Sequence, residues 1–453
     1  MKKADRFVVV LILALLAGFA APVSGRISSL ESKVDALIKP YFDARSFNGS
    51  VLIAKDGRIL LEKSYGMANY ELDIPNTPET KFHIASLSKS FTATAVLMLE
   101  ERGKLSVRDP LSKFVPDFPN GDKITLHHLL THTGGIARDL PDFDDRWPLR
   151  HSLEQLVELI KKAPPEATEP DGKYRYSNNG YRLLAYVIEK VSGKSYGEFL
   201  RQNIFDPLGM KDTGHDGDAG RLIRGRASGY VPAGRDGFEN APFLDWTTKT
   251  GNGSLYSTVG DLYKFDRALY TEKLLKKTTI EKMYAEPYGW FTGERFDRRV
   301  IRYNGNSPGF NADFQRYIDD DVCIVLLSNN YAAVSTMIGT SLAAIVFDRP
   351  YRTPEFGPIR RVDEKQLQTF IGNYRGNDQF FFPGVGLKIE NKGDYLAMTW
   401  SSGATAPLAP LGENRFIDRR FWGIVIFEKN DQGKTDKLIW RYDGRDYVAD
   451  RID

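Results

Sequence analysis

The chain has a single cysteine, Cys323, among its 453 residues, so it cannot form an internal disulfide. It also has little excess of one charge: 62 basic residues face 59 acidic ones, and the two kinds are interleaved. Proteins that bind nucleic acid gather basic charge on one surface, so this pattern predicts no nucleic-acid partner. The sequence has no internal repeat and no low-complexity tract. The fold therefore depends on a large hydrophobic core, and the length predicts more than one domain.

Long apolar runs are lacking except near the N-terminus, where residues 7–21 are apolar. This run is shorter than the about 20 residues that a membrane-spanning helix needs. Lys2, Lys3 and Arg6 precede it, and small residues follow it near residues 23–25. These features predict a secretory signal peptide that is cleaved there, with an uncleaved anchor as the alternative. We therefore expect a secreted or periplasmic protein without stable membrane insertion after cleavage.

Strand and helix patterns predict an α+β domain before residue 349. Two β-rich runs flank Asp56-Gly57, a strong hairpin signal. Residues 105–285 have mostly helical and loop patterns, and strand patterns return at RRVIRY, DFQRYI and VCIVLLS before a last helix over 336–347. The sheet is thus expected to combine strands from both ends of the domain, with helices inserted between them.

Composition and strand spacing divide the remaining chain. The segment 349–363 is rich in proline and charge, which is typical of a linker. Short strand patterns alternate with turns beyond it, as in a small antiparallel β domain or barrel. We therefore expect a signal peptide (1–25), a main domain (26–348), the linker, and a C-terminal β-barrel-like domain (364–453).

Ser86 and Lys89 begin a long helical pattern that extends to about Arg102. Residues three apart share one face of a helix, so the lysine amine can lie beside the serine hydroxyl. At a helix start, the backbone N–H of Ser86 can donate to a developing oxyanion. A desolvated lysine can take the proton of a serine and make it a strong nucleophile. A Ser-x-x-Lys pair alone is a weak signal, since one arises by chance about once in a chain of this length.

A second polar cluster, Tyr176 and Asn178, lies in a turn-rich segment just before another helical pattern. A phenol near lysine ammonium groups can be held as phenolate and can pass a proton to a leaving group. The asparagine amide offers both a donor and an acceptor to a substrate or to Lys89. Taken alone, this segment is equally typical of a helix cap with a tyrosine packed beneath it.

Four blocks of the sequence together resemble the serine β-lactamase family, which includes class C β-lactamases, D-alanyl-D-alanine carboxypeptidases, D-amino-acid-specific peptidases and related esterases. The blocks are HIASLSKSFTATAVLMLEERGKLSVRDPL, ITLHHLLTHTGGI, YRYSNNGYRLLAYVIEKVSGKSYGEFLRQNIFDPLGM and GSLYSTVGDLYKF. They follow the family's order and spacing over roughly residues 35–348. The later segment LQTFIGNYRG is similar to a β domain appended to some members.

This resemblance implies both a fold and roles for particular residues. The fold would be a β-lactamase/transpeptidase-like antiparallel sheet with helices on both faces and an inserted helical region. Ser86 would be the acylated nucleophile and Lys89 its activator. Tyr176 would be the general base and acid, and Asn178 would contact the substrate. No cofactor and no metal are implied.

The third motif of the family, Lys-Thr-Gly or His-x-Gly, lies on an edge strand that precedes a hairpin and the final helix. The literal match at residues 249–251 instead precedes a helical pattern. Tyr303-Asn304-Gly305 has the expected context. We therefore assign the motif to Tyr303 and Gly305, with the backbone N–H of Asn306 as the second oxyanion donor.

Tyr303 then stands where the family has a cation or an imidazole, and this affects the expected substrate. A neutral phenol cannot make the charge-assisted contact that a cation makes with a carboxylate. Ester or amide substrates without that carboxylate are therefore favoured. Lys249, on a loop near the rim of the cleft in related folds, is an alternative partner for a carboxylate.

Two other patterns do not support alternative chemistries. Residues 305–309 fit the Gly-x-Ser-x-Gly motif of α/β-hydrolases, but that motif needs a later histidine, and the last histidine is His215. The segment HHLLTH (127–132) has spacing that could suit a metal but contains no acidic or thiol ligand.

The sequence thus predicts an exported serine hydrolase that acts on a small ester or peptide substrate through an acyl-enzyme. One alternative is a D-alanyl-D-alanine carboxypeptidase, D-aminopeptidase or β-lactamase. A second is a non-catalytic protein that binds peptides or cell wall with a degenerate site. The sequence gives no signal for the oligomeric state.

Overall fold

The structure is a computed structural model that describes residues 23–453 except 143–145, 333, 352, 355–356 and 443. The expected signal peptide lies outside the described residues apart from residues 23–25, which begin helix α1 (Val23–Asp43). No helix in the described part of the chain combines the length and the apolar character that a membrane span requires.

The main domain is built on one six-stranded antiparallel sheet, whose strand order is β10-β11-β12-β13-β1-β2. The N-terminal hairpin pairs with a strand that follows it by more than 250 residues, as the register Gly49↔Ser328 shows. Asp56 and Gly57 form the predicted turn, with φ of 52° and 72°. The strands are β1 (Gly49–Lys55), β2 (Arg58–Tyr65), β10 (Phe291–Arg295), β11 (Arg298–Ser307), β12 (Phe310–Tyr317) and β13 (Val322–Ser328).

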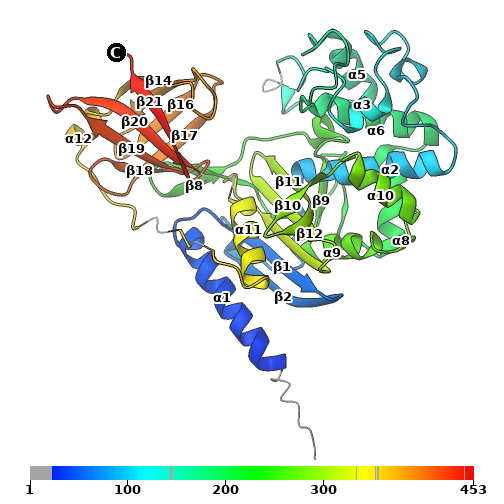
Figure 1. The fold of residues 1–453 in the computed structure, drawn as a ribbon, viewed down its shortest axis with the longest axis horizontal. Helices are drawn as coiled ribbons and strands as arrows, with labels where there is room; N and C mark the ends of the chain where they lie inside the picture. Colours follow the sequence, from blue (N-terminus) through cyan, green and yellow to red (C-terminus); the bar gives the residue numbers. More distant parts are fainter. Residues whose placement is uncertain (1–22, 143–145, 333, 352, 355–356, 443) are drawn as a thin grey trace, which may run out of the picture.

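Helices cover both faces of this sheet, as expected (Figure 1). α1 and α11 (Ser335–Val346) pack on one face, where Ile324 and Leu326 of β13 join their core cluster. Val325 and Leu327 of the same strand point to the opposite face, toward α2 (Ser88–Glu101) and α9 (Val259–Ala268). Side chains alternate across a strand, so a strand covered on both sides is apolar at every position. This explains the uninterrupted VCIVLLS run.

The predicted helix over 86–102 is an α-helix only from Ser88. Residues Ala85–Leu87 form a 3-10 turn, η1, and α2 follows over Ser88–Glu101. The other helical elements that the structure describes before residue 290 are η2 (Leu111–Lys113), α3 (Leu126–Leu130), α5 (Leu153–Lys162), α6 (Asn178–Ser192), α7 (Tyr196–Leu200), the π-helical turn η3 (Arg201–Phe205), α8 (Asp206–Leu208), η4 (Trp246–Lys249), α9 (Val259–Ala268) and α10 (Lys277–Ala285).

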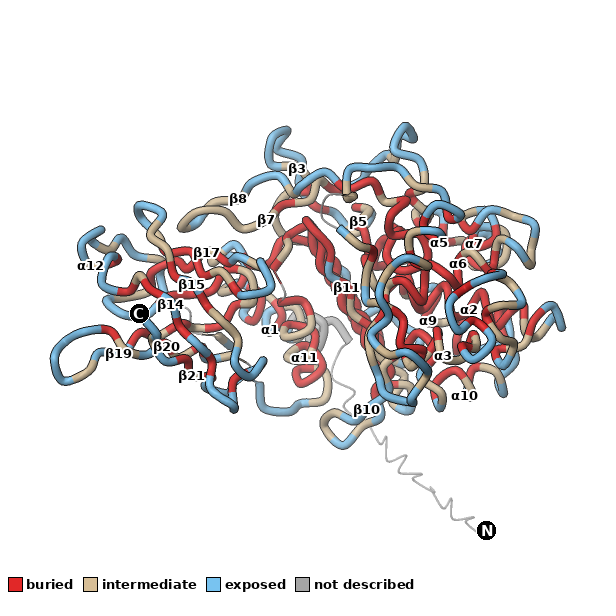
Figure 2. Tube along the Cα trace, turned by 90° about the horizontal axis from the view of Figure 1, so that it is seen from above, coloured by how far each residue is buried: buried red, intermediate tan, exposed pale blue. Residues whose placement is uncertain are grey.

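Short strands lie between these helices and pair in small sheets. They are β3 (Met67–Asn69), β4 (Ile74–Pro75), β5 (Phe82–His83), β6 (Gly214–His215), β7 (Tyr230–Ala233), β8 (Gly237–Asn240) and β9 (Leu255–Ser257). The pair β7–β8 projects as a hairpin toward the C-terminal part of the chain (Figure 2).

The C-terminal part forms a closed eight-stranded antiparallel barrel in which sequential strands are neighbours. A short helix, α12 (Glu364–Gln368), precedes it. The barrel strands are β14 (Gly372–Gly376), β15 (Gly386–Asn391), β16 (Leu396–Trp400), β17 (Thr405–Pro410), β18 (Arg415–Asp418), β19 (Ile424–Lys429), β20 (Thr435–Tyr442) and β21 (Arg445–Arg451).

The barrel packs on the main domain and is not a separate body on a free linker. Ile417 and Trp422 belong to the same hydrophobic cluster as α1 and α11. The buried side chain of Arg419 reaches the β7–β8 hairpin, where its Nη1 donates to the carbonyl oxygen of Ala233 at 2.8 Å. Its Nη2 donates to the carbonyl oxygen of Gly237 at 3.0 Å.

Candidate active site

Ser86 lies where the turn η1 meets strand β11. The preceding residue, Ala85, has φ of 47°, an uncommon conformation for a residue other than glycine. A Cβ atom on Gly305 would lie 2.1 Å from the carbonyl oxygen of Ile84, so only glycine allows β11 to pass so close to the turn. The backbone of β11 thereby fixes the position of the serine.

The edge of β11 beside Ser86 is not covered by a neighbouring strand. β10 pairs with β11 only over Arg298–Arg302, whereas β12 pairs with it as far as Ser307. Residues 303–307 therefore present one unpaired edge toward the site. An extended substrate segment can add to such an edge through backbone hydrogen bonds.

Lys89 lies one helical turn after Ser86 and is fully buried. Its Nζ donates to Ser86 Oγ at 3.1 Å, to Asn178 Oδ1 at 2.9 Å and to the carbonyl oxygen of Asn252 at 2.8 Å. Burial lowers the pKa of Lys89 well below its ordinary value. Asp139 opposes this shift, while the nearby cations Lys249, Arg182 and Arg138 add to it. A lysine in this setting can exist as the neutral amine that a general base requires.

Tyr176 contacts the serine from the other side. Its Oη donates to Ser86 Oγ at 2.8 Å. Burial raises the pKa of Tyr176 to about 12, so the phenol is protonated at neutral pH. Lys89 Nζ lies 4.9 Å from the centre of the ring and Arg138 Cζ lies 5.2 Å from it. Arg138, and Lys89 once it has taken a proton, would stabilise a phenolate formed during a reaction.

Asn178 is oriented by a carboxylate that the sequence did not suggest. Its Nδ2 donates to both carboxylate oxygens of Asp139, at 3.1 and 2.9 Å, which turns its Oδ1 toward Lys89. The buried guanidinium of Arg182 donates to the same carboxylate at 3.2 Å. Asp139 is the third residue after the THTGGI block, and no local motif marks it.

His132 holds the backbone on both sides of Tyr176. Its Nδ1 accepts from the backbone N–H of Ser177 at 3.1 Å, and its carbonyl oxygen accepts from the N–H of Arg175 at 2.8 Å. The imidazole ring also packs against the phenol ring, with centroids 4.6 Å apart. Burial lowers the pKa of His132 to about 3, so the ring is neutral and can accept this hydrogen bond.

These side chains surround a cavity of about 300 Å³. Of the residues predicted for the site, Ser86, Tyr176, Asn178, Tyr303 and Asn306 line the cavity. Lys89 lies beneath it, and Gly305 contributes the close backbone approach. Sequence reasoning missed the lining residues Arg138, Tyr174, Asn252, Gly253, Phe291 and Ser307.

Two buried polar groups of the lining have no hydrogen-bond partner among the described residues: Asn252 Nδ2 and Ser307 Oγ. Unpaired buried polar groups are rare in folded proteins, and at a cavity they are available to a ligand. The site can therefore offer a substrate hydrogen bonds beyond those of the two oxyanion donors predicted at Ser86 and Asn306.

Tyr303 is only 3% exposed and stacks on Phe291, with ring centroids 4.9 Å apart. Lys249, from the literal Lys-Thr-Gly match, ends η4 and also lines the cavity. Tyr303 on β11 and Lys249 at the end of η4 thus both line the cavity that contains Ser86.

The two patterns set aside in the sequence have structural functions here. Ser307 ends β11 and is followed by a turn into β12, and no helix follows it as in an α/β-hydrolase. His127 Nδ1 lies 2.7 Å from Tyr288 Oη, and His128 completes a helix cap with Thr125. The described residues contain no group of three or more histidine, cysteine or acidic side chains placed to hold a metal ion.

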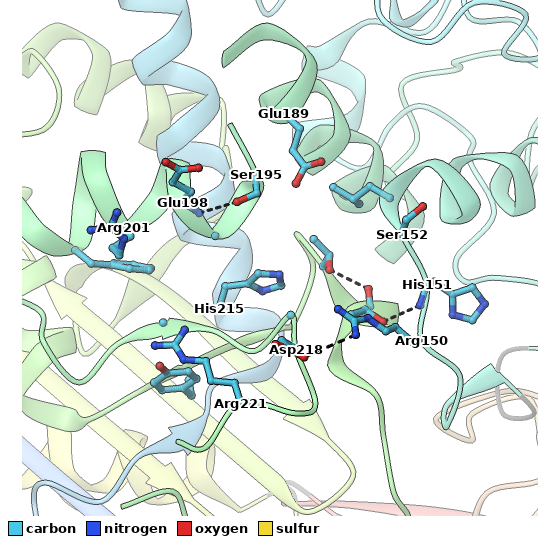
Figure 3. A pocket seen from close by; sticks show the side chains of 18 of the residues that line it. Arg150, His151, Ser152, Glu189, Ser195, Glu198, Arg201, His215, Asp218 and Arg221 are labelled. Carbon is cyan, nitrogen blue, oxygen red and sulfur yellow. Dashed lines mark hydrogen bonds and ion pairs between the residues drawn. The ribbon is translucent and has the colours of Figure 1, made fainter. Parts of the chain in front are cut away.

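Residues in and next to η4 also line a larger cavity of about 550 Å³, which Figure 3 shows from close by. Thr247 and Thr250 line it, whereas Lys249 lines the smaller cavity. Arginine and acidic side chains also line it, among them Arg150 and Asp218, whose Nη1 and Oδ1 atoms are 3.7 Å apart. Neither Ser86 nor Lys89 contributes to this cavity, so the smaller one is the candidate active site.

A family model described as Beta-lactamase matches residues 34–338. The chain belongs to the beta-lactamase family. Penicillin-binding protein 4* of Bacillus subtilis (strain 168) is 29% identical to this family member over 458 residues, 92% of this chain and 98% of that protein. Teichoic acid D-alanine hydrolase of Staphylococcus aureus (strain NCTC 8325 / PS 47) is 31% identical over 303 residues, 64% of this chain and 72% of that protein.

The similarity to solved structures extends beyond the beta-lactamase domain. The octameric penicillin-binding protein homologue from Pyrococcus abyssi has a TM-score of 0.63 and 26% identity, and the match covers 94% of this chain and 99% of that one. The predicted α+β fold followed by a C-terminal antiparallel β barrel is confirmed. Membership of the beta-lactamase family makes this protein a serine hydrolase.

Proposed function

We propose that the protein hydrolyses ester or amide bonds through an acyl-enzyme formed on Ser86. The observation that carries this proposal is the convergence of two proton-transferring groups on one hydroxyl: Lys89 Nζ and Tyr176 Oη lie 3.1 and 2.8 Å from Ser86 Oγ. A protein that only binds its ligand does not need an activated nucleophile, and this argues against the binding-protein alternative.

In acylation, Ser86 Oγ attacks the carbonyl carbon while the neutral amine of Lys89 takes the hydroxyl proton. The tetrahedral intermediate collapses as Tyr176 gives its phenolic proton to the leaving oxygen or nitrogen. In deacylation, the Tyr176 phenolate takes a proton from water, whose oxygen attacks the acyl carbon. The bond between the acyl carbon and Ser86 Oγ then breaks as Lys89 returns its proton to Oγ. This step releases the acid and restores the enzyme to its starting state, the alcohol or amine having left in acylation.

The charge of the cavity bears on the choice of substrate. Tyr303 is neutral and buried, which supports esters or amides without a carboxylate at that position. However, Arg138 and Lys249 line the cavity, and the described lining includes no acidic residue. This second observation favours the carboxypeptidase alternative, in which these two cations would receive a substrate carboxylate. The name of the Staphylococcus aureus relative also supports testing D-alanyl substrates.

The proposed setting of this reaction rests on the N-terminal sequence. Its basic start and short apolar run support export, with the enzyme acting outside the cytoplasm on a small ester or peptide. The balance of basic and acidic residues argues against a nucleic-acid partner.

Hydrolysis of a short-chain p-nitrophenyl ester by the mature protein and by Ser86→Ala tests the mechanism. We expect turnover by the wild type and a fall to the background rate in the variant, because no other side chain replaces the hydroxyl. Ser29→Ala is the matched control, since Ser29 is exposed on α1 and does not line the cavity. Equal rates for the wild type and Ser86→Ala would contradict the proposal.

A further inference from the structure

A second candidate binding site lies at one end of the C-terminal barrel, in a cavity of about 540 Å³. The residues that line it come from the β14–β15, β16–β17 and β18–β19 connections and from the end of β20. In a barrel of sequential antiparallel strands, these connections share one end, so the cavity is the mouth of the barrel. Ligand sites of small molecules have about 300–1,000 Å³, and eight-stranded barrels can hold one such ligand.

The described lining of this mouth is aromatic and uncharged. Six of its residues are aromatic: Phe381, Phe382, Trp400, Phe421, Trp440 and Tyr442. None of the other described lining residues carries a charge. A charged ligand would lose its hydration here without gaining a counter-charge, which is costly. The site therefore suits an uncharged ligand.

Packing of the barrel does not explain the two phenylalanines at the rim. Phe380 belongs to the barrel core, but Phe381 and Phe382 are 49% and 58% exposed. They form an edge-to-face pair with centroids 4.8 Å apart, and Phe381 also lies 6.2 Å from the ring of Trp440. Contiguous exposed aromatic rings on a soluble protein mark an interaction site.

Trp400 adds a polar group to this lining. It is 6% exposed, and its indole N–H has no hydrogen-bond partner among the described residues. A buried donor left unpaired is unfavourable, and an acceptor atom on a ligand would remove this penalty.

We propose that the barrel mouth binds an uncharged alkyl or acyl chain that carries a hydroxyl or ester oxygen. The chain packs against the aromatic rings, and the oxygen accepts from the N–H of Trp400. A saccharide suits the site less well, because its many hydroxyl groups need partners and the described lining supplies side-chain hydroxyls only from Ser401, Ser402 and Tyr442. This binding is separate from hydrolysis at Ser86.

Titration of the full-length mature protein with the uncharged fluorophore N-phenyl-1-naphthylamine tests this inference. We expect saturable binding of one probe per chain and displacement by 1-dodecanol. The double variant Phe381→Ser with Phe382→Ser should bind the probe at least tenfold more weakly. Leu222→Ser, which removes a 90% exposed apolar side chain from the main domain, should bind it as the wild type does.

A second variant separates the hydrogen bond from apolar contact. Trp400→Phe keeps a ring but removes the N–H, so dodecanol should bind several-fold more weakly while the hydrocarbon-like probe binds nearly as before. Unchanged ester hydrolysis, unchanged far-ultraviolet circular dichroism and cooperative thermal unfolding show that each variant is folded. The proposal is overturned if the wild type shows no saturable binding, if the double variant binds as well, or if a neutral oligosaccharide displaces the probe and dodecanol does not.

Discussion

At the scale of single residues, the protonation of Lys89 controls the proposed reaction. Attack by Ser86 requires the neutral amine, so kcat/KM should rise with pH as Lys89 loses its proton. Because burial and neighbouring cations lower the pKa of Lys89, this rise should occur below the ordinary range of lysine. Tyr176, with a pKa of about 12, should stay protonated throughout this rise.

Replacement of one cation tests this electrostatic account. In Lys249→Met the pKa of Lys89 should increase, since a like charge has been removed, and the ascending limb of the pH–rate profile should move to higher pH. The measurement is kcat/KM for a neutral p-nitrophenyl ester between pH 5 and 10, with Lys211→Met, an exposed residue on another loop, as the control. A limb that stays in place would show that Lys249 does not set the pKa of the base.

His132 provides a prediction about positioning. His132→Ala removes the acceptor for the N–H of Ser177 and the ring against Tyr176, so kcat should fall about 10–100-fold with little change in KM. His132→Asn should recover much of this loss, because asparagine supplies an acceptor and tolerates the φ of 60° at this position.

The pH profile separates this positioning role from acid–base chemistry by the imidazole. His132 is neutral above its pKa of about 3, so neither variant should lose a titrating group from the working range. If His132→Asn were as inactive as His132→Ala, the backbone hydrogen bond would not be the reason for this histidine.

At the scale of elements, the contact between β11 and η1 explains how a strand and a turn far apart in sequence form one site. Gly305→Ala would force a Cβ against the carbonyl oxygen of Ile84 and displace either the strand or the turn. We expect destabilisation of about 1–3 kcal/mol, the usual cost of overpacking, and a large loss of kcat for ester hydrolysis.

Gly293→Ala is the matched control for this prediction. Gly293 lies on the neighbouring strand β10, and a Cβ there would meet nothing within 4 Å. Chemical denaturation and ester hydrolysis should therefore differ little from those of the wild type. If both glycine variants behaved alike, the close approach of β11 would not position Ser86.

At the scale of the whole molecule, Arg419 connects the barrel to the β7–β8 hairpin of the main domain. Arg419→Met would leave the carbonyl oxygens of Ala233 and Gly237 without this donor in a partly buried contact. Loss of these hydrogen bonds destabilises the folded state, so calorimetry should show a lower melting temperature for the variant. Arg415→Met removes an exposed arginine from the same barrel and should leave the melting temperature nearly unchanged. Equal melting temperatures for the wild type and Arg419→Met would show that this contact does not stabilise the molecule.

The sequence alone determined the features that depend on neighbours along the chain. The proximity of Ser86 and Lys89 follows from the geometry of one helical turn, and the Asp56-Gly57 hairpin follows from the backbone that these residues allow. Strand and turn patterns also predicted a sheet with strands from both ends of the main domain and a C-terminal β domain, whereas the resemblance to the family implied helices on both faces of the sheet. Resemblance to the family added Tyr176 and Asn178, which local patterns could not connect to Ser86.

Only the tertiary structure decided which distant side chains share the site. Asp139 and His132 act through hydrogen bonds to residues about 40 positions away, and neither stands in a motif that predicts such a contact. Likewise, the docking of the barrel depends on Arg419 meeting backbone carbonyls more than 180 residues earlier. Such contacts depend on how packed layers bring segments together, and this packing is a property of the whole chain that local spacing does not encode.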